Sequence, residues 1–248
     1  MRQLFFRALF DYETKPYDEI WHAVDDSIAV HYPQKNSVWS CGTRNVKRDL
    51  IAKKLKENEG GIVLTDDFEI TIVGDGSRIF DEILITMHEH NFDFIDTMIR
   101  KFCQWPEFIF SYATDWEFNN WQNAATPYSY IMANKPHEHI PRLAGQELGK
   151  DLWNERLDLS NNPGRTVFHK GYVESIGGVM YVTKKLTDLT GGDLSKLRQL
   201  AFLEIDDWGD CLRIEMDANL FAAAENQPEL CAKMDAVRAV LFPPKISQ

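Results

Sequence analysis

Two short histidine-containing segments have the residue types and spacing of metal ligands. His88–His90 and His137–His139 both read His-Glu-His. Residues i and i+2 of a strand point to the same face, so each pair of imidazoles could bind one metal ion. With Asp81, Asp93 or Asp115 as further ligands, the segments would form the two-metal site of a hydrolase. The alternative is a solvated strand end and a proline-flanked loop, because no longer metal-binding motif such as His-Glu-x-x-His accompanies them.

Other catalytic patterns are missing from the sequence. There is no Gly-x-Ser-x-Gly elbow, and the segment Gly74–Gly76 lacks the Lys and Ser of a phosphate-binding loop. No two cysteines form a Cys-x-x-Cys pair, which predicts free, buried thiols in a reducing compartment. These cysteines are Cys41, Cys103, Cys211 and Cys231. We therefore expect a cytoplasmic protein with no catalytic residues, no metal and no cofactor.

Acidic and aromatic residues occur together in three stretches that contain no Lys or Arg, namely 57–77, 102–134 and 199–212. Carboxylates without compensating cations repel one another, unless a cationic partner meets them. Trp is a favoured anchor at protein interfaces, and surrounding carboxylates add steering and specificity. The alternative is a solvated acidic surface above core tryptophans. The candidate partner-binding residues are Glu204, Asp206, Asp207, Trp208 and Asp210, followed by Asp115, Trp116 and Glu117.

The negative net charge of the chain favours a partner protein with a basic surface. The 248 residues carry a formal net charge of −11, concentrated in residues 61–142 and 204–248. Such a chain is repelled by nucleic-acid phosphates, so we expect no direct binding to DNA or RNA. No apolar run approaches the roughly 20 residues needed to cross a bilayer, so we expect no membrane association.

The first half of the chain predicts strands and helices that would position these residues. Apolar residues indicate strands in four ranges and follow helical spacing in three others. The strands are Leu4–Phe10, Phe68–Val73 and Ile83–His88, followed by a fourth at Phe108–Tyr112; the helices follow Pro16, Thr43 and Asn91. Thr43 and Asn91 are expected N-caps, and the second helix would carry Val46, Leu50, Ile51 and Leu55 on one face.

The second half predicts two hairpins and a terminal helix. The first hairpin would pair Val167–Val173 with Val179–Thr183, and the second would pair Phe202–Asp206 with Cys211–Met216. A helix follows Pro228. These elements predict an α+β fold with mixed or antiparallel sheets, helices packed on one face, and a second half that is a variation of the first. The turn Asn161–Gly164 would divide a sub-domain of residues 1–160 from one of residues 161–248, packed as one compact unit.

These features resemble bacterial immunity proteins of the polymorphic-toxin type, and most closely the immunity protein 52 family. The resemblance rests on the strand that begins at Leu4, the segments Asp115–Glu117 and Asp206–Asp210, and the helix after Pro228. It implies a cytoplasmic protein that neutralises a cognate toxin of the restriction-endonuclease-like class, in competition between bacteria through type VI secretion. No functional residue is transferred from the family.

The implied partner is therefore a toxin with a basic surface, and the first candidate contact is the acidic hairpin Glu204–Asp210. Two alternatives stay open at the level of sequence. One is a metal-dependent hydrolase that uses the two His-Glu-His segments, and the other is a non-catalytic adaptor for a different basic partner. The sequence leaves the oligomeric state open.

Overall fold

A single antiparallel sheet of ten strands organises the chain. The computed structural model describes residues 3–33, 39–41, 44–143, 155–217 and 227–244. The strand order is β11-β12-β10-β7-β1-β6-β5-β4-β2-β3, and every pairing is antiparallel. The strands are β1 (Leu4–Asp11), β2 (Trp39–Cys41), β3 (Arg44–Val46), β4 (Gly61–Leu64), β5 (Phe68–Asp75), β6 (Phe80–Met87), β7 (Phe108–Asp115), β10 (Val179–Thr183), β11 (Glu204–Asp207) and β12 (Cys211–Glu215). A separate two-stranded sheet pairs β8 (Val167–His169) with β9 (Tyr172–Glu174).

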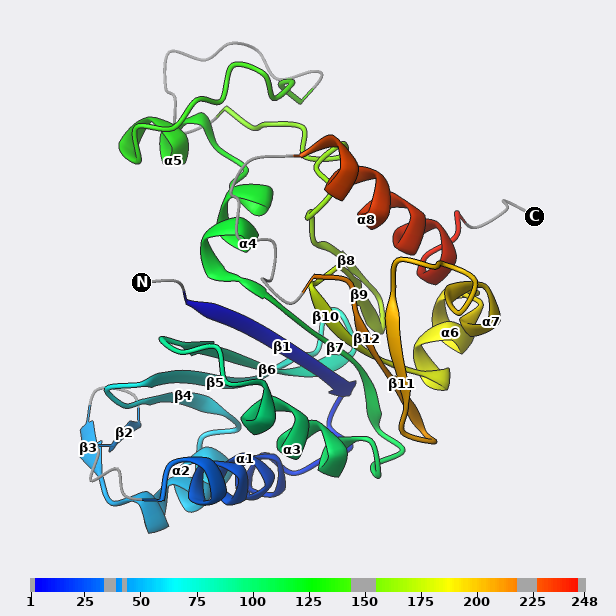
Figure 1. The fold of residues 1–248 in the computed structure, drawn as a ribbon. Coiled ribbons are helices and arrows are strands. Elements are labelled where there is room, and N and C mark those ends of the chain that lie inside the picture. The colour runs from blue at the N-terminus through cyan, green and yellow to red at the C-terminus, as the bar shows by residue number, and fades with distance from the viewer. Residues whose placement is uncertain (1–2, 34–38, 42–43, 144–154, 218–226, 245–248) are drawn as a thin grey trace.

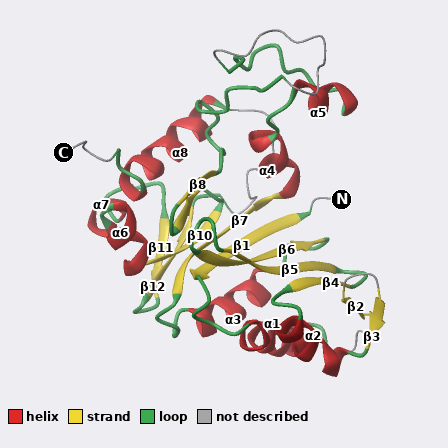
Figure 2. Ribbon diagram, turned by 180° about the vertical axis from the view of Figure 1, so that it is seen from behind, coloured by secondary structure: helices red, strands yellow, loops and turns green. Residues whose placement is uncertain are grey.

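Helices cover different faces of this sheet in the two halves of the chain (Figure 1). The helices are α1 (Tyr17–His31), α2 (Ile51–Glu57), α3 (Phe92–Phe102), α4 (Trp116–Asn123), α5 (Pro127–Met132), α6 (Lys184–Thr190), α7 (Leu194–Leu197) and α8 (Pro228–Leu241). Helices α1 to α3 pack on one face, below the sheet in Figure 1, and α6 to α8 lie on the other. Figure 2 shows the same arrangement from behind.

The alternation of side chains along each strand explains the two cores. Ile70 of β5 and Ile83 of β6 pack into the cluster that contains the inner sides of α1 to α3. Phe110 of β7 and Met180 of β10 point the other way and pack with Leu241 of α8. Successive residues of a strand face opposite sides, so one sheet supplies both clusters. The central strands β1 and β7 are buried on both faces for this reason.

The structure confirms the α+β class and the antiparallel form of the sheet. The expectation that the helices share one face is wrong for the whole chain, because the two halves use opposite faces of a shared sheet. Strand β7 from residues 1–160 pairs directly with β10 from residues 161–248. Within the described ranges, no helix has the length and apolar character to span a membrane.

Several predicted elements are confirmed with small changes of boundary. Strand β1 begins at Leu4, helix α8 begins at Pro228, and the second hairpin is formed by β11 and β12. Asn91 is the N-cap of α3, because its Oδ1 accepts a hydrogen bond from the backbone N–H of Phe94 at 3.0 Å.

The predicted helix after Thr43 is wrong in its position. Val46 belongs to strand β3, and the helix begins at Ile51 after a 3₁₀ turn at Arg48–Leu50. Thr43 itself lies outside the described residues. The backbone of this segment finds its hydrogen bonds in the sheet, where β2 pairs with both β3 and β4. Strand β4 was absent from the prediction.

The predicted pairing of Val167–Val173 with Val179–Thr183 is also wrong. Gly171 adopts a φ of 85° in the middle of the first range, so the chain turns there and β8 pairs with β9. Strand β10 instead pairs with β7 and β12. Gly177 permits this close approach, because a Cβ at Gly177 would lie 2.6 Å from the carbonyl oxygen of Ala113.

Candidate partner-binding surface

The acidic hairpin, which we define as Glu204–Asp210, forms one edge of the ten-stranded sheet. Glu204, Asp206, Asp207 and Asp210 are all exposed. The Asp207 carboxylate accepts hydrogen bonds from the backbone N–H of Gly209 at 2.9 Å and from Arg198 Nη2 at 2.6 Å. These bonds, the first of them foremost, lower the pKa of Asp207 below its ordinary value, so the carboxylate is ionised at neutral pH.

Trp208 packs the acidic hairpin against helix α3. Its ring is half-buried, lies 3.7 Å from the guanidinium carbon of Arg100 and 5.6 Å from the ring of Tyr181. A cation over an indole face is attractive, and this one also covers apolar surface. Part of the Trp208 ring therefore packs within the chain, and part of it stays accessible at the sheet edge.

A polar network beneath the acidic hairpin adds to this attachment. The buried Tyr181 hydroxyl donates to Asp96 Oδ1 at 2.5 Å, and Arg213 Nε donates to the same oxygen at 3.2 Å. Arg213 Nη1 bonds to Glu215 at 3.0 Å and lies 3.9 Å from Asp206. Burial, then the negative charge of Asp96, raises the pKa of Tyr181 well above its ordinary value. The network fixes β10, β12 and α3 relative to one another.

The segment Asp115–Glu117 lies at the start of helix α4 and has a largely structural environment. Asp115 is buried, and its Oδ1 accepts from the backbone N–H of Phe118 at 2.9 Å as the N-cap. Asp115 therefore caps helix α4. Glu117 bonds to Lys135 Nζ at 2.6 Å, and this hydrogen bond lowers the pKa of Glu117. Trp116 is 41% exposed and is the accessible aromatic residue of this segment.

The two candidate segments lie at opposite ends of the sheet. Asp115 pairs with Leu4 at the last residue of β7. Near the other end of β7, Phe110 pairs with Val182 of β10. The next residue of β10, Thr183, pairs with Cys211, which directly follows the acidic hairpin. The structure therefore does not bring Asp115–Glu117 and the acidic hairpin into one patch.

The two His-Glu-His segments have separate surroundings. His88 Nδ1 lies 3.1 Å from Gln3 Nε2, and the ring of His137 lies 5.9 Å from that of Tyr130. Asp81 is buried and accepts hydrogen bonds from the Glu13 backbone N–H and the Tyr17 hydroxyl. In the part of the chain that the structure describes, no group of three or more His, Cys, Asp or Glu residues could hold a metal ion.

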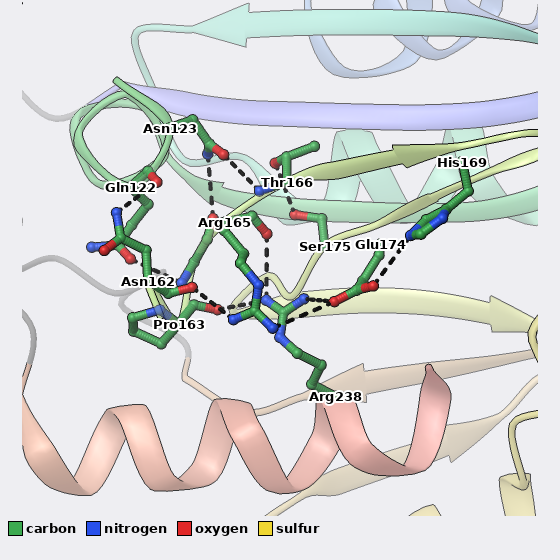
Figure 3. A network of polar contacts seen from close by, with 11 residues as sticks. Gln122, Asn123, Asn162, Pro163, Arg165, Thr166, His169, Glu174, Ser175 and Arg238 are labelled. Atoms are coloured by element: carbon green, nitrogen blue, oxygen red, sulfur yellow. Dashed lines mark hydrogen bonds and ion pairs between the residues drawn. The ribbon is translucent and has the colours of Figure 1, made fainter. Parts of the chain in front are cut away.

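A buried arginine, which sequence reasoning missed, ties the second half together (Figure 3). Arg238 of α8 donates from Nη1 to Glu174 Oε1 at 2.5 Å and from Nη2 to the carbonyl oxygen of Pro163 at 2.7 Å. Glu174 also meets Arg165 Nη2 at 3.7 Å and His169 Nε2 at 3.3 Å. Burial lowers the pKa of Arg238, and the ion pair with Glu174 opposes that effect. We call Arg238, Glu174 and Arg165 the arginine clamp.

Helix α4 holds the other side of the same turn. Gln122 Oε1 accepts from the Gly164 backbone N–H at 2.9 Å, and Asn123 Oδ1 accepts from the Thr166 backbone N–H at 2.6 Å. Asn162 Nδ2 donates to the Gln122 carbonyl oxygen at 3.0 Å. The turn that looks like a boundary in the sequence is therefore a point of attachment between α4, the β8–β9 hairpin and α8 (Figure 3).

Comparison with known proteins gives a fold relationship. No family model matches the chain, and no curated protein matches it significantly. Among solved structures, the chain resembles the Pseudomonas aeruginosa T6SS protein PA0821, with a TM-score of 0.54 and 13% sequence identity. The match covers 100% of this chain and 77% of that one. At this identity the likeness shows a shared fold.

Proposed function

We propose that this chain is an immunity protein of a type VI secretion system that binds a cognate toxin and neutralises it in the cytoplasm. The observation that carries the proposal is the acidic hairpin, an exposed and firmly attached run of carboxylates at the sheet edge. The fold likeness to a T6SS protein supports the same setting. In this proposal the chain acts by stoichiometric binding and catalyses no reaction.

The charges favour a toxin whose active site binds phosphates, as that of a nuclease does. Such a site is basic, and the chain carries a net charge of −11. Complementary charges accelerate encounter, with association rate constants up to about 10⁸–10⁹ M⁻¹s⁻¹ at low salt. Because Trp208 and the network around Arg213 hold the acidic hairpin in place, little conformational entropy is lost when a partner binds there.

Charge reversal at Asp206, Asp207 and Asp210 tests this proposal. The tagged wild-type chain is used to capture its partner from its source cells at moderate salt, and mass spectrometry identifies that partner. The purified partner is then titrated with the triple lysine variant. We expect a basic, toxin-like partner and a loss of affinity of at least tenfold for the variant, with an unchanged circular dichroism spectrum.

A matched control changes the net charge equally at another surface. Glu19, Asp26 and Glu57 are exposed on α1 and α2, away from the acidic hairpin. Their replacement by lysine changes the net charge of the chain by the same amount as the hairpin variant. It therefore measures how much of the affinity depends on long-range attraction between the chain and its partner. Equal effects of the two triple variants, or no effect of either, would remove the acidic hairpin from the interface.

A further inference from the structure

The acidic hairpin supplies charge to an interface but little accessible apolar surface. Its single aromatic residue, Trp208, is half-buried against Arg100 and Tyr181. Tight protein complexes usually depend on a few apolar or aromatic anchors that become fully desolvated. If the chain neutralises a toxin, an apolar contact surface is therefore expected elsewhere on it.

The side of β4, β5 and β6 that faces away from α1 to α3 has this character. Inward residues of these strands, such as Val63, Ile72 and Ile85, belong to the core cluster beneath the sheet. The alternate residues must then face the opposite side. Figures 1 and 2 show no described helix over that side of these three strands. We call this surface the open face, and its residues are Ile62, Leu64, Glu69, Thr71, Val73, Glu82, Leu84 and Thr86.

Strand register joins these residues into continuous rows. Ile62 pairs with Thr71, which pairs with Leu84 on the next strand. Leu64 pairs with Glu69 in the neighbouring row. Ile62 is 43% exposed and Leu64 is 37% exposed, so both place large apolar side chains in solvent. Apolar side chains grouped on one exposed sheet face are typical of an interaction site, whereas isolated ones are not.

The open face itself carries only acidic side chains, and two arginines beside it pair with carboxylates. Its eight residues include two glutamates and no Lys or Arg. The adjacent Arg7 pairs with Glu82 at 3.1 Å, and Arg78 pairs with Asp75 at 3.2 Å. Glu69 is exposed on the face itself. The open face therefore complements a partner that places apolar side chains among lysines or arginines.

An aromatic residue of the β8–β9 hairpin borders the open face on its inner side. Phe168 is 39% exposed, and its ring lies 3.9 Å from the guanidinium carbon of Arg78 and 5.2 Å from that of Arg7. The backbone N–H of Gly171 donates to the Arg78 carbonyl oxygen at 2.6 Å, which fixes the tip of that hairpin beside the β5–β6 turn. Phe168 thus extends the apolar surface toward the middle of the sheet.

We infer that the open face is the apolar docking surface for the same basic toxin that the acidic hairpin attracts. This inference rests on the proposed function. The acidic hairpin then governs the rate of encounter, and the open face governs the lifetime of the complex.

The test compares two pairs of exposed apolar residues. The double variant Ile62→Ser, Leu64→Ser removes apolar groups from the open face. The control variant Val30→Ser, Leu189→Ser removes two other exposed apolar side chains, from α1 and α6. The probe is the purified partner captured by the wild-type chain, and binding kinetics are measured by surface plasmon resonance. Urea unfolding of each variant verifies that it remains folded.

We expect the open-face variant to dissociate at least tenfold faster, with a nearly unchanged association rate, and the control to match the wild type. Wild-type binding that the open-face variant leaves unaltered would overturn this inference and leave the proposed function standing. No binding by the wild type would overturn both. A wild-type dimer in sedimentation velocity that the open-face variant abolishes would assign the surface to a second copy of the chain and overturn the toxin assignment.

Discussion

Replacement of Arg238 by methionine tests whether the arginine clamp stabilises the second half of the chain. Methionine keeps most of the apolar stem and removes the charge and the donors. Arg238 is 5% exposed, and its guanidinium donates to Glu174 at 2.5 Å and to the Pro163 carbonyl oxygen at 2.7 Å. Removal of one member of a buried ion pair costs about 3–5 kcal/mol of unfolding free energy, since the remaining charge is left without its partner.

The structure places the expected loss at the lower end of that range, about 3 kcal/mol. Glu174 keeps Arg165 at 3.7 Å and His169 at 3.3 Å, so its negative charge is not left wholly uncompensated. Lys101→Met is the control, because Lys101 pairs with Asp26 at 2.7 Å on the surface. Its side chain is 37% exposed and that of Asp26 is 68% exposed, and such pairs contribute about 1 kcal/mol or less.

Urea unfolding at pH 7 measures both variants, with the slope of unfolding free energy against urea concentration fitted together with the midpoint. A double-mutant cycle with Glu174→Gln isolates the pair, and we expect the double variant to cost less than the sum of the two single variants. A loss below about 1 kcal/mol for Arg238→Met, or strict additivity in the cycle, would refute the view that the clamp is a coupled buried network.

Three further predictions concern the candidate surface. Asp115→Ala removes the N-cap of α4 and should cost about 1 kcal/mol of unfolding free energy; a neutral result in urea unfolding would argue against the cap. Trp208→Ala should cost about 2–3 kcal/mol of unfolding free energy because its ring packs within the chain, whereas Trp116→Ala, at an exposed ring, should cost less than about 1 kcal/mol; the reverse order would show that the contacts of Trp208 contribute little to stability. Asp207→Asn should lower stability at neutral pH, because the pKa of Asp207 is lower in the folded chain than its ordinary 3.8. The difference in unfolding free energy from wild type should be complete above pH 3.8 and shrink as the pH falls through the folded pKa; a difference that does not shrink on acidification would contradict this.

Local patterns in the sequence predict much of the sheet and several helices. Alternation of apolar and polar residues at Phe68–Val73 identifies β5, and the Asn91 side chain marks the start of α3. Both signals arise from contacts within a few residues of the chain. Strand β4 is not predicted because it is only four residues long and begins at a glycine, a residue type that usually indicates a turn.

The environment of the site residues depends on contacts between distant segments, and the sequence alone does not specify these. Trp208 meets Arg100 only because the acidic hairpin folds back over α3. In the sequence alone, Arg238 is typical of an exposed residue of an amphipathic helix. Only the fold places Glu174 beside it. Asp115 was the exception, since an aspartate directly before a helix is a typical N-cap and could have been identified as one.

Growth rescue tests the central claim, neutralisation of a toxin, most directly. The captured partner is expressed under an inducible promoter in a heterologous bacterium, with the wild-type chain, the Asp206, Asp207 and Asp210 lysine variant, or an empty vector. We predict that the partner arrests growth, that the wild-type chain restores it, and that the triple variant restores it poorly at equal abundance. A partner that leaves growth unaffected, or arrest that the wild-type chain fails to relieve, would contradict the proposed immunity function.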